Sequence, residues 1–267
     1  MFERPPTSQS ELFEIGQALA EDIERAEKER IQLEDFRGAK YFTDEEIDRD
    51  IAFTKIKKSE FEEREANSPP EVKKMRENAR IIELFLPMAI KDYDWLGENT
   101  NVIQTSTYDD YANGVDSVVQ MMEPNETRNL GLEIDFTSSI AEMEDKIKRI
   151  GTSIQEGKVA RVKYFDSLAT GKLKNLKMPK IAFGAPFNEI MDFADAFVEA
   201  RKNPQSEGLR KAVMDHPLKN KFLEYTANQL QEFGRLAAEA GNIELALLHH
   251  NVLETMKSRG LMPGDKK

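Results

Sequence analysis

The feature that most constrains this chain is the segment NLGLEIDFTSS, residues 129–139, in which apolar and polar residues alternate strictly. The apolar positions are Leu130, Leu132, Ile134 and Phe136. Such alternation predicts a β-strand with one apolar face. The other face carries Glu133 and Asp135, and aspartate is disfavoured in strands. That face is therefore either simply exposed to water or built to hold a metal ion.

The rest of the chain is predicted to contain helices on both sides of a cluster of strands. The expected helices span residues 8–35, 44–66, 69–90 and 139–156, and further helices follow from 186 onward with breaks near 203–204, 216–217 and 241–242. The expected strands span residues 100–107, 113–121, 129–137, 159–165 and 180–185, and the lysine-rich stretch 171–179 is expected to be a loop.

These elements predict an α/β fold of the mixed α+β kind, a small mixed sheet with a crossover helix and helical extensions at both ends. Helix 139–156 is long enough for a crossover, so the strands on either side of it are expected to be parallel. We expect a charged helical extension over residues 1–67, an α/β core over 68–185 and C-terminal helices packed on that core over 186–267.

Charge is distributed unevenly along the 267 residues. The formal net charge is −11, which argues against a protein that coats nucleic acid indiscriminately. Residues 1–67 contain nineteen Asp/Glu and eleven Lys/Arg, whereas residues 146–180 contain ten Lys/Arg and two Asp/Glu. The basic segment either binds a phosphate backbone locally or is a solvent-exposed surface whose lysines only keep the protein in solution.

Composition also limits the classes of site. The sequence has no cysteine, which excludes thiolate metal sites and suits a cytoplasmic protein. No signal-peptide pattern is present at the N-terminus, and the longest apolar run, 81–90, is too short to span a membrane. We therefore expect no membrane partner. His249 and His250 are adjacent on a predicted helix and point about 100° apart, so they do not form a paired ligand site.

An antiparallel hairpin of residues 114–121 and 130–137 brings acids together. If Met121 pairs with Leu130, Asp116 lies opposite Asp135 and Val118 opposite Glu133. Carboxylates on directly opposed residues repel each other unless a cation lies between them. This register predicts a metal held by Asp116 and Asp135.

Glu83 is a further candidate, placed inside the apolar run IIELFLPMAI. A helix that is apolar nearly all round is buried, and a buried carboxylate needs a metal or a lysine as partner. The alternative is that Glu83 lies on an exposed stripe of its helix.

Over roughly residues 70–185 this order of elements resembles the PD-(D/E)XK nuclease superfamily, the restriction-endonuclease-like fold. Glu83 resembles the glutamate of the first core helix, Asp116 in NGVD the first motif aspartate, and Asp135 the second acid, with Glu133 as its alternative. The resemblance implies Mg²⁺ as cofactor and phosphodiester hydrolysis. Residues 107–116 also resemble a loop in uncharacterised bacterial proteins of similar layout.

The chain departs from the superfamily pattern at Thr137, which stands where the motif has a lysine that helps to activate water. The resemblance then implies either a lysine from a neighbouring element or a site that binds metal yet cleaves slowly. The candidate substitutes are Lys146, Lys148, Lys158 and Lys163.

Two functions follow from these observations. In the first, the chain is a nuclease-like protein that acts on or binds DNA or RNA, and the basic segment contacts the phosphate backbone. The cations expected to do so are Lys158, Arg161, Lys163, Lys172 and Lys174. In the second, the acidic face is solvent-exposed and the N-terminal helices bind another protein, without enzymatic activity.

Overall fold

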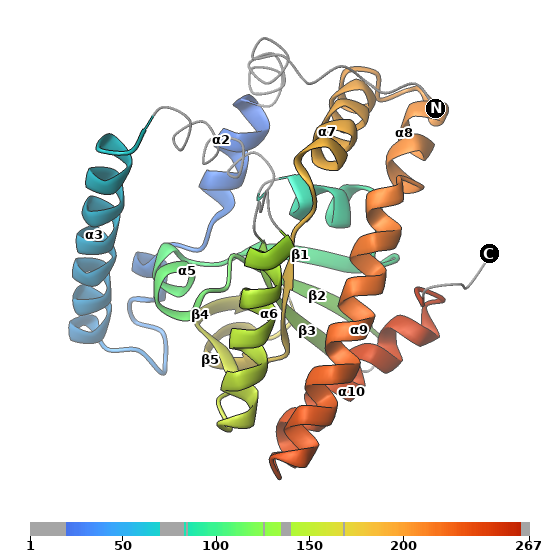
Figure 1. The fold of residues 1–267 in the computed structure, drawn as a ribbon. Helices are drawn as coiled ribbons and strands as arrows, with labels where there is room; N and C mark the ends of the chain where they lie inside the picture. The colour runs from blue at the N-terminus through green and yellow to red at the C-terminus, as the bar shows by residue number, and fades with distance from the viewer. Residues whose placement is uncertain are drawn as a thin grey trace.

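The computed structural model describes residues 20–69, 83, 85–124, 126–134, 140–167 and 169–262. Its centre is a four-stranded mixed sheet of order β1-β2-β3-β6 (Figure 1). The strands are β1 (Thr100–Gln104), β2 (Ser117–Glu123), β3 (Glu126–Ile134) and β6 (Lys180–Phe183). The first three strands are antiparallel neighbours, and β6 runs parallel to β3. The predicted mixed α+β class is confirmed.

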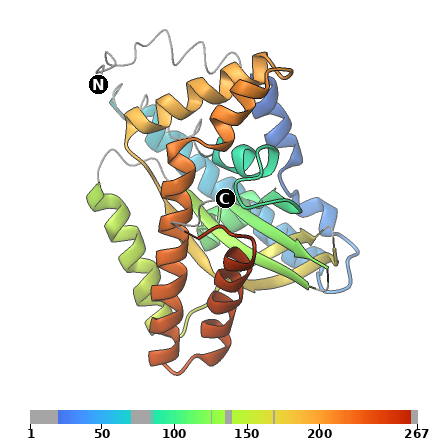
Figure 2. The ribbon, with the colours of Figure 1, turned by 90° about the vertical axis from the view of Figure 1, so that its right-hand side faces the viewer.

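The alternating segment has the predicted apolar face. Leu130 and Leu132 are buried in the main hydrophobic cluster. The C-terminal helices cover this face of the sheet (Figure 2). They are α7 (Phe187–Lys202), α8 (Glu207–Met214), α9 (Pro217–Glu239) and α10 (Ile243–Ser258), and the predicted breaks between them are confirmed. At the far end of the cluster, the indole N–H of Trp95 donates to the Val213 carbonyl over 3.1 Å.

A second, two-stranded sheet packs against the other face. It consists of β4 (Ala160–Ser167) and β5 (Gly171–Met178), so the expected loop at 171–179 is wrong. The lysines of residues 171–179 suggested a loop. In the structure, however, Met178 is buried in one cluster with Val118 of β2, and Leu173 and Leu176 pack against this cluster. A Cβ at Gly131 would lie 3.2 Å from the Met178 sulfur, so this glycine lets β5 approach the main sheet closely.

Helix α6 (Ile140–Gln155) follows β3 in the chain and closely matches the helix predicted for residues 139–156. In Figure 1 it lies in front of the sheet, between the β4–β5 pair and α9. The parallel partner of β3 is β6, and β4 belongs to the second sheet. The two strands that flank α6 in the sequence, β3 and β4, therefore belong to different sheets, and the chain returns to the main sheet as β6 only after the β4–β5 hairpin.

The N-terminal segment is less regular than predicted. Helix α2 (Ala20–Glu29) ends before an extended stretch in which the Ile31 N–H donates to the Gln104 carbonyl of β1. A 3₁₀ turn (Leu33–Phe36) follows, so a single helix to residue 35 is wrong. Residues 8–19 of that prediction lie outside the described residues. Helix α3 (Asp44–Ala66) matches its prediction, and the Thr43 hydroxyl caps it by accepting from the Glu46 N–H.

Two further helices complete the fold. Residues 85–92 are helical, while most of the predicted helix before them, residues 70–82 and 84, lies outside the described residues. Helix α5 (Thr107–Asn113) was expected as part of a loop and the neighbouring strands. Ser106 caps α5 through the Asp109 N–H, and Gly114 ends it in a left-handed conformation. Serine before a short run and glycine after it are the signals that indicate this helix.

Candidate anion-binding site

A partly buried ion-pair cluster lies where β3, β6 and α6 meet. Glu133 of β3 contacts Lys180, the first residue of β6, with 2.8 Å between Oε2 and Nζ. Its other oxygen lies 3.4 Å from the ammonium of Lys146 on α6. The side chains of all three residues are less than one-fifth exposed. The acidic face of the alternating strand is therefore neither plainly exposed nor lined by acids alone.

The charges in this cluster set the ionisation of its carboxylate. Burial by itself would raise the pKa of Glu133, but the charges of Lys180 and Lys146 and their hydrogen bonds outweigh burial. The pKa of Glu133 is held below its usual value. Glu133 is accordingly a carboxylate at neutral pH and lies beside two ammonium groups.

The turn after α5 closes one side of the cluster. Gly114 has a φ of +59°, and its carbonyl accepts a 3.2 Å hydrogen bond from Lys180. A Cβ at this position would lie 3.4 Å from the Lys180 Nζ and 3.9 Å from the Glu133 Oε2. These are ordinary contact distances, so glycine is favoured here because a residue with a side chain would be strained in this left-handed conformation.

The cluster opens into a cavity of about 530 Å³ that we call the basic cleft. Its charged lining residues are Glu133, Lys146, Arg149, Lys158, Arg161 and Lys180. The cations come from α6, from the start of β4 and the turn before it, and from β6. Five cations facing one carboxylate favour a ligand with negative charge, because each like-charged neighbour raises the attraction for an anion.

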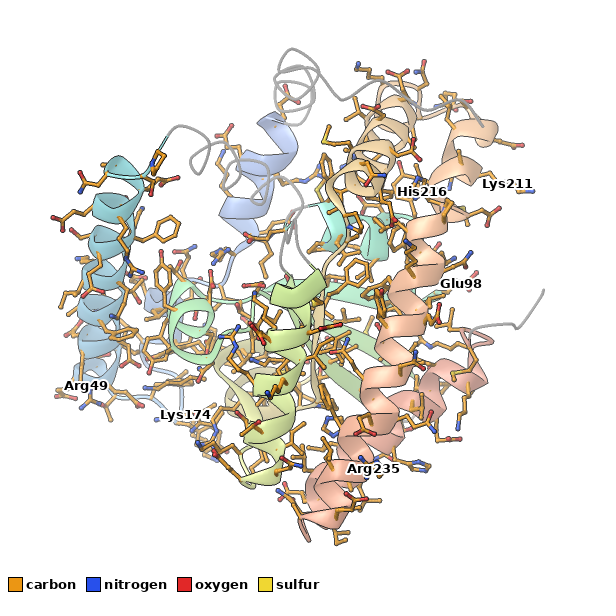
Figure 3. All side chains as sticks on the ribbon, in the orientation of Figure 1. Arg49, Glu98, Lys174, Lys211, His216 and Arg235 are labelled. Carbon is orange, nitrogen blue, oxygen red and sulfur yellow. The ribbon has the colours of Figure 1, made fainter. Side chains whose placement is uncertain are left out.

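Elsewhere the cations lie at separate places on the surface or beside acids. In Figure 3, Arg49, Lys211 and Arg235 lie on α3, α8 and α9, at separate places on the molecule. Arg235, for example, is neutralised by Glu232 and Glu239 on its own helix. The basic cleft therefore differs by its balance of charge: five cations and one carboxylate line it, whereas the cavity beside α2 and β1 is lined by five cations and four carboxylates.

The predicted metal pair depends on a register that the structure does not have. Ser117 pairs with Leu132 and Glu123 with Glu126, so the hairpin connection is two residues long. The expected pairing of Met121 with Leu130 is wrong: Met121 pairs with Arg128, because Thr127 and Arg128 extend the ladder.

Asp116 lies outside the paired residues of the ladder, whose last pair joins Ser117 to Leu132. The Asp116 N–H donates to the Leu132 carbonyl just before β2 begins. Asp135 and Thr137 lie outside the described residues. Among the residues that the structure does describe, no group of three or more His, Asp or Glu side chains is arranged to hold a metal ion.

The other predicted catalytic residues are divided among different places. Lys146 and Lys158 line the basic cleft, and Lys158 also pairs with Glu156 at 2.6 Å. Lys148 is exposed on α6 and does not line the cleft. Glu83 is helical and half-buried, and it too is not part of the cleft lining. Lys163 points away from the cleft, into a separate network.

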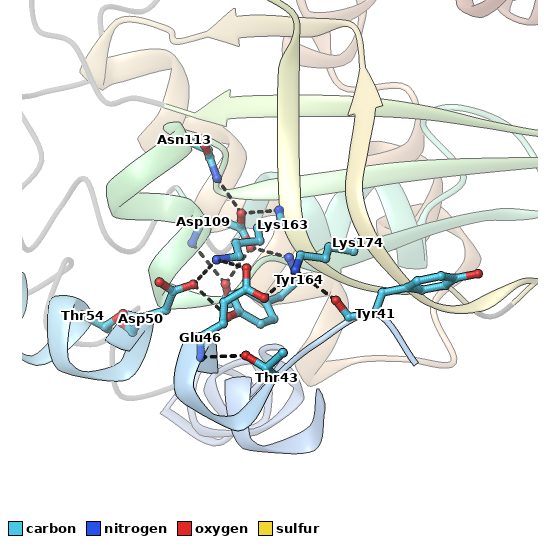
Figure 4. A network of polar contacts seen from close by, with 11 residues as sticks. Tyr41, Thr43, Glu46, Asp50, Thr54, Asp109, Asn113, Lys163, Tyr164 and Lys174 are labelled. Carbon is cyan, nitrogen blue, oxygen red and sulfur yellow. Dashed lines mark hydrogen bonds and ion pairs between the residues drawn. The ribbon is translucent and has the colours of Figure 1, made fainter. Parts of the chain in front are cut away.

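That network joins the N-terminal segment to β4 and β5 (Figure 4). The Lys163 ammonium lies between Asp50 and Glu46 of α3, 2.7 Å from a Glu46 oxygen. Lys174 pairs with the other oxygen of Glu46. Lys172 donates to the Asp35 carbonyl. Of the five cations predicted to bind nucleic acid, only Lys158 and Arg161 therefore line the cleft; the other three contact the acidic N-terminal segment.

Asp109 holds the same region together from the inside. Its carboxylate accepts from the backbone N–H groups of Lys163 and Tyr164, at 2.6 and 3.1 Å. It also accepts from Ser106 at 2.8 Å and Asn113 at 2.7 Å. Asp109 is fully buried. Through these contacts Asp109 has a structural role, because it attaches α5 to β4.

Sequence reasoning missed two cleft residues, Lys180 and Arg149, as site candidates. Lys180 opens the strand KIAF, and its pairing beside β3 could be found only by placing that strand next to the acidic one. Arg149 lies one helical turn from Lys146 on α6, a spacing that predicts a shared face.

No family model, curated protein or solved structure matches this chain. Within the described ranges, no helix combines the length and apolar character needed to cross a bilayer.

Proposed function

We propose that this protein binds nucleic acid through the basic cleft, as a nuclease-like protein whose hydrolytic activity depends on Mg²⁺. The observation that carries the proposal is the gathering of five Lys/Arg side chains and a single carboxylate around one cavity, in a protein whose net charge is −11. Phosphate groups are the ligands that such a cluster selects, and contacts to phosphates supply most of the affinity for nucleic acid.

The order of elements supports the nuclease-like part of the proposal. Three antiparallel strands are followed by helix α6, and after the β4–β5 hairpin the chain returns to the main sheet as β6, parallel to β3. Glu133 directly follows Leu132, whose carbonyl accepts from the Asp116 N–H, and in this proposal Glu133 takes the role of the second acid. Lys180 and Lys146 contact its carboxylate, so either one supplies the ammonium that Thr137 does not.

The described residues fit a Mg²⁺ site only in part. Asp116 and Glu133 lie near the same end of the β2–β3 ladder, and carboxylate oxygens are the ligands that Mg²⁺ prefers. Both oxygens of Glu133, however, lie beside ammonium groups, and a divalent cation there would be repelled by them. The residues of the cleft therefore support phosphate binding better than they support hydrolysis, and no chemical step is assigned to a metal.

The binding proposal is tested by fluorescence anisotropy with labelled single- and double-stranded DNA and RNA. Lys146→Gln and Arg149→Gln should each weaken binding and reduce the slope of log K against log salt by about one for each phosphate that is no longer neutralised. Lys148→Gln is the matched control, because Lys148 lies on the same helix and outside the cleft. Equal effects of all three substitutions, or no binding of any nucleic acid by the native protein, would contradict the proposal.

Hydrolysis is tested on whichever nucleic acid binds, with Mg²⁺ and with a chelator. Cleavage that needs Mg²⁺ and is lost in Glu133→Gln supports an active nuclease-like site. Tight binding without cleavage under either condition supports a site that has kept phosphate recognition alone.

The alternative is a non-enzymatic protein that binds a protein partner through its N-terminal segment. Its support is the exposure of apolar side chains there: Tyr41 is 57 % exposed and Ile56 of α3 59 %. A folded protein that binds no nucleic acid in the anisotropy experiment would favour this alternative.

A further inference from the structure

The basic cleft has an apolar wall as well as charged residues. Ile150 and Ile154 of α6 and Leu245 of α10 line the cavity and are buried in one hydrophobic cluster. Arg149, Lys158 and Arg161, by contrast, are exposed. A bare phosphate makes no use of the apolar wall, whereas a nucleobase has an apolar face that packs against such side chains.

His249 of α10 adds a polar atom to the buried part of the lining. The residue is 1 % exposed and belongs to the cleft wall. Its Nδ1 lies 2.8 Å from the Leu245 carbonyl. A carbonyl only accepts hydrogen bonds, so Nδ1 carries the proton and Nε2 is left as an acceptor.

That acceptor has no partner among the described residues, although it is buried. Buried nitrogen atoms without a hydrogen bond are uncommon in folded proteins, and a bound water or ligand is one of the explanations for such an atom. Burial also lowers the pKa of the imidazole, against the smaller effect of its bond to Leu245. His249 therefore stays neutral at pH 7 and keeps Nε2 free to accept.

The imidazole is held in place from α9. The His249 ring meets the Phe233 ring edge-on with 6.2 Å between centroids. A Cβ at Gly234 would lie 3.3 Å from the His249 Cβ, so the two helices approach closely at this point. A fixed acceptor of this kind selects a ligand with a donor at one place, which a flexible side chain does not do.

We propose that the basic cleft takes one nucleoside phosphate unit, whose phosphate lies among the exposed cations. Its base packs on the apolar wall and a base or ribose donor bonds to Nε2 of His249. This inference rests on the proposed function and names the ligand of the same site. The cavity of about 530 Å³ lies within the range of roughly 300–1,000 Å³ that is usual for small-molecule pockets. This nucleoside phosphate unit is either a free nucleotide or the terminal nucleotide of a DNA or RNA strand.

The first experiment compares ligands by isothermal titration calorimetry on the full chain. Adenosine 5′-monophosphate should bind at least about tenfold more tightly than ribose 5-phosphate, and inorganic phosphate should bind most weakly. An oligonucleotide with a 5′-phosphate is then compared with the same oligonucleotide ending in a 5′-hydroxyl. A preference for the phosphorylated end assigns the site to strand ends, and equal affinities assign it to free nucleotides. Equal binding of adenosine 5′-monophosphate and ribose 5-phosphate overturns the inference.

The second experiment removes the acceptor. His249→Phe keeps the aromatic contact with Phe233 and should weaken adenosine 5′-monophosphate about tenfold, the loss of one hydrogen bond. Inorganic phosphate binding should not change. His250→Phe is the control, because His250 is the adjacent and exposed histidine. An unchanged affinity of His249→Phe for the nucleotide overturns the inference.

A third measurement uses the native protein and does not depend on whether the variant folds. The chain has three histidines, so ¹⁵N-histidine labelling gives a short NMR spectrum that His250→Phe helps to assign. Addition of adenosine 5′-monophosphate should shift the Nε2 resonance of His249, and a resonance that stays unmoved at saturation overturns the inference. If Lys146→Gln still weakens oligonucleotide binding in that case, the proposed function stands without the nucleotide unit.

Discussion

Lys180→Met should destabilise the protein strongly at neutral pH and much less at acid pH. The substitution keeps most of the side-chain volume and removes the ammonium 2.8 Å from Glu133. The Glu133 carboxylate then remains partly buried, and among the described residues Lys146, at 3.4 Å, is its remaining ion-pair partner. Its pKa should rise, because burial is no longer outweighed by two charges.

The size of the effect follows from burial. Removing one partner of a fully buried ion pair costs about 3–5 kcal/mol. The Glu133 side chain is 18 % exposed and Lys146 remains, so we expect a smaller loss, about 2 kcal/mol at pH 7. In the native protein the lowered pKa of Glu133 stabilises the fold above the unfolded-state pKa, and this contribution disappears as pH falls through the folded-state value. Below about pH 4 Glu133 is largely protonated in the unfolded chain, and the cost of Lys180→Met should fall below about 1 kcal/mol.

Urea denaturation at pH 7 and at acid pH measures both values. The control is Lys177→Met, because Lys177 pairs with Glu244 at 3.0 Å and both side chains are about half-exposed or more. An exposed pair contributes about 0–1 kcal/mol and should show little contrast between the two pH values. The double variant Lys180→Met/Glu133→Gln removes the buried charge as well and should be more stable at pH 7 than Lys180→Met alone.

The reasoning is refuted if Lys180→Met costs no more than Lys177→Met at pH 7. It is equally refuted if the cost is the same at both pH values, since the buried carboxylate would then not be its source.

Other positions give further tests by urea denaturation. Gly114→Ala should cost about 1–2 kcal/mol, because φ of +59° strains a residue with a Cβ; Gly208→Ala, where a Cβ meets nothing within 4 Å inside α8, should be neutral or stabilising. Asp109→Asn should cost about 2–3 kcal/mol, because its amide group would face backbone N–H donors, whereas Asp110→Asn, at a one-third-exposed side chain, should cost under about 1 kcal/mol. Lys163→Met should cost about 3 kcal/mol, because it leaves two acids of α3 without their shared cation. Equal losses within either matched pair, or a stable Lys163→Met, would contradict these assignments.

Several parts of the fold were predictable because they depend on residues close together in the sequence. The alternation of Leu130 and Leu132 with polar residues fixes which side chains share a face, since successive residues of a strand point to opposite sides. The cap at Thr43 and the breaks between the C-terminal helices are similarly local. Helix α6 was also predicted nearly to the residue.

For the candidate site, the sequence predicted several of the residues but not how they are arranged. The sequence indicates Glu133, Lys146, Lys158 and Arg161, and the structure brings these four together. The sequence does not indicate which lysines of the basic segment line the cleft and which contact other parts of the chain. Lys163 and Lys174 contact acids more than one hundred residues away in the chain, and no local pattern reports such pairs.

The sequence by itself therefore determined the two faces of β3 and the identity of its acids. Tertiary structure alone decided what those acids contact. The two-residue connection between β2 and β3 sets the register, the packing of β5 over Gly131 covers the second face, and the parallel pairing of β6 brings Lys180 to Glu133. The physical reason is range: side-chain direction follows from the backbone geometry of neighbouring residues, whereas register and ion pairing follow from burial between segments that are distant in the chain.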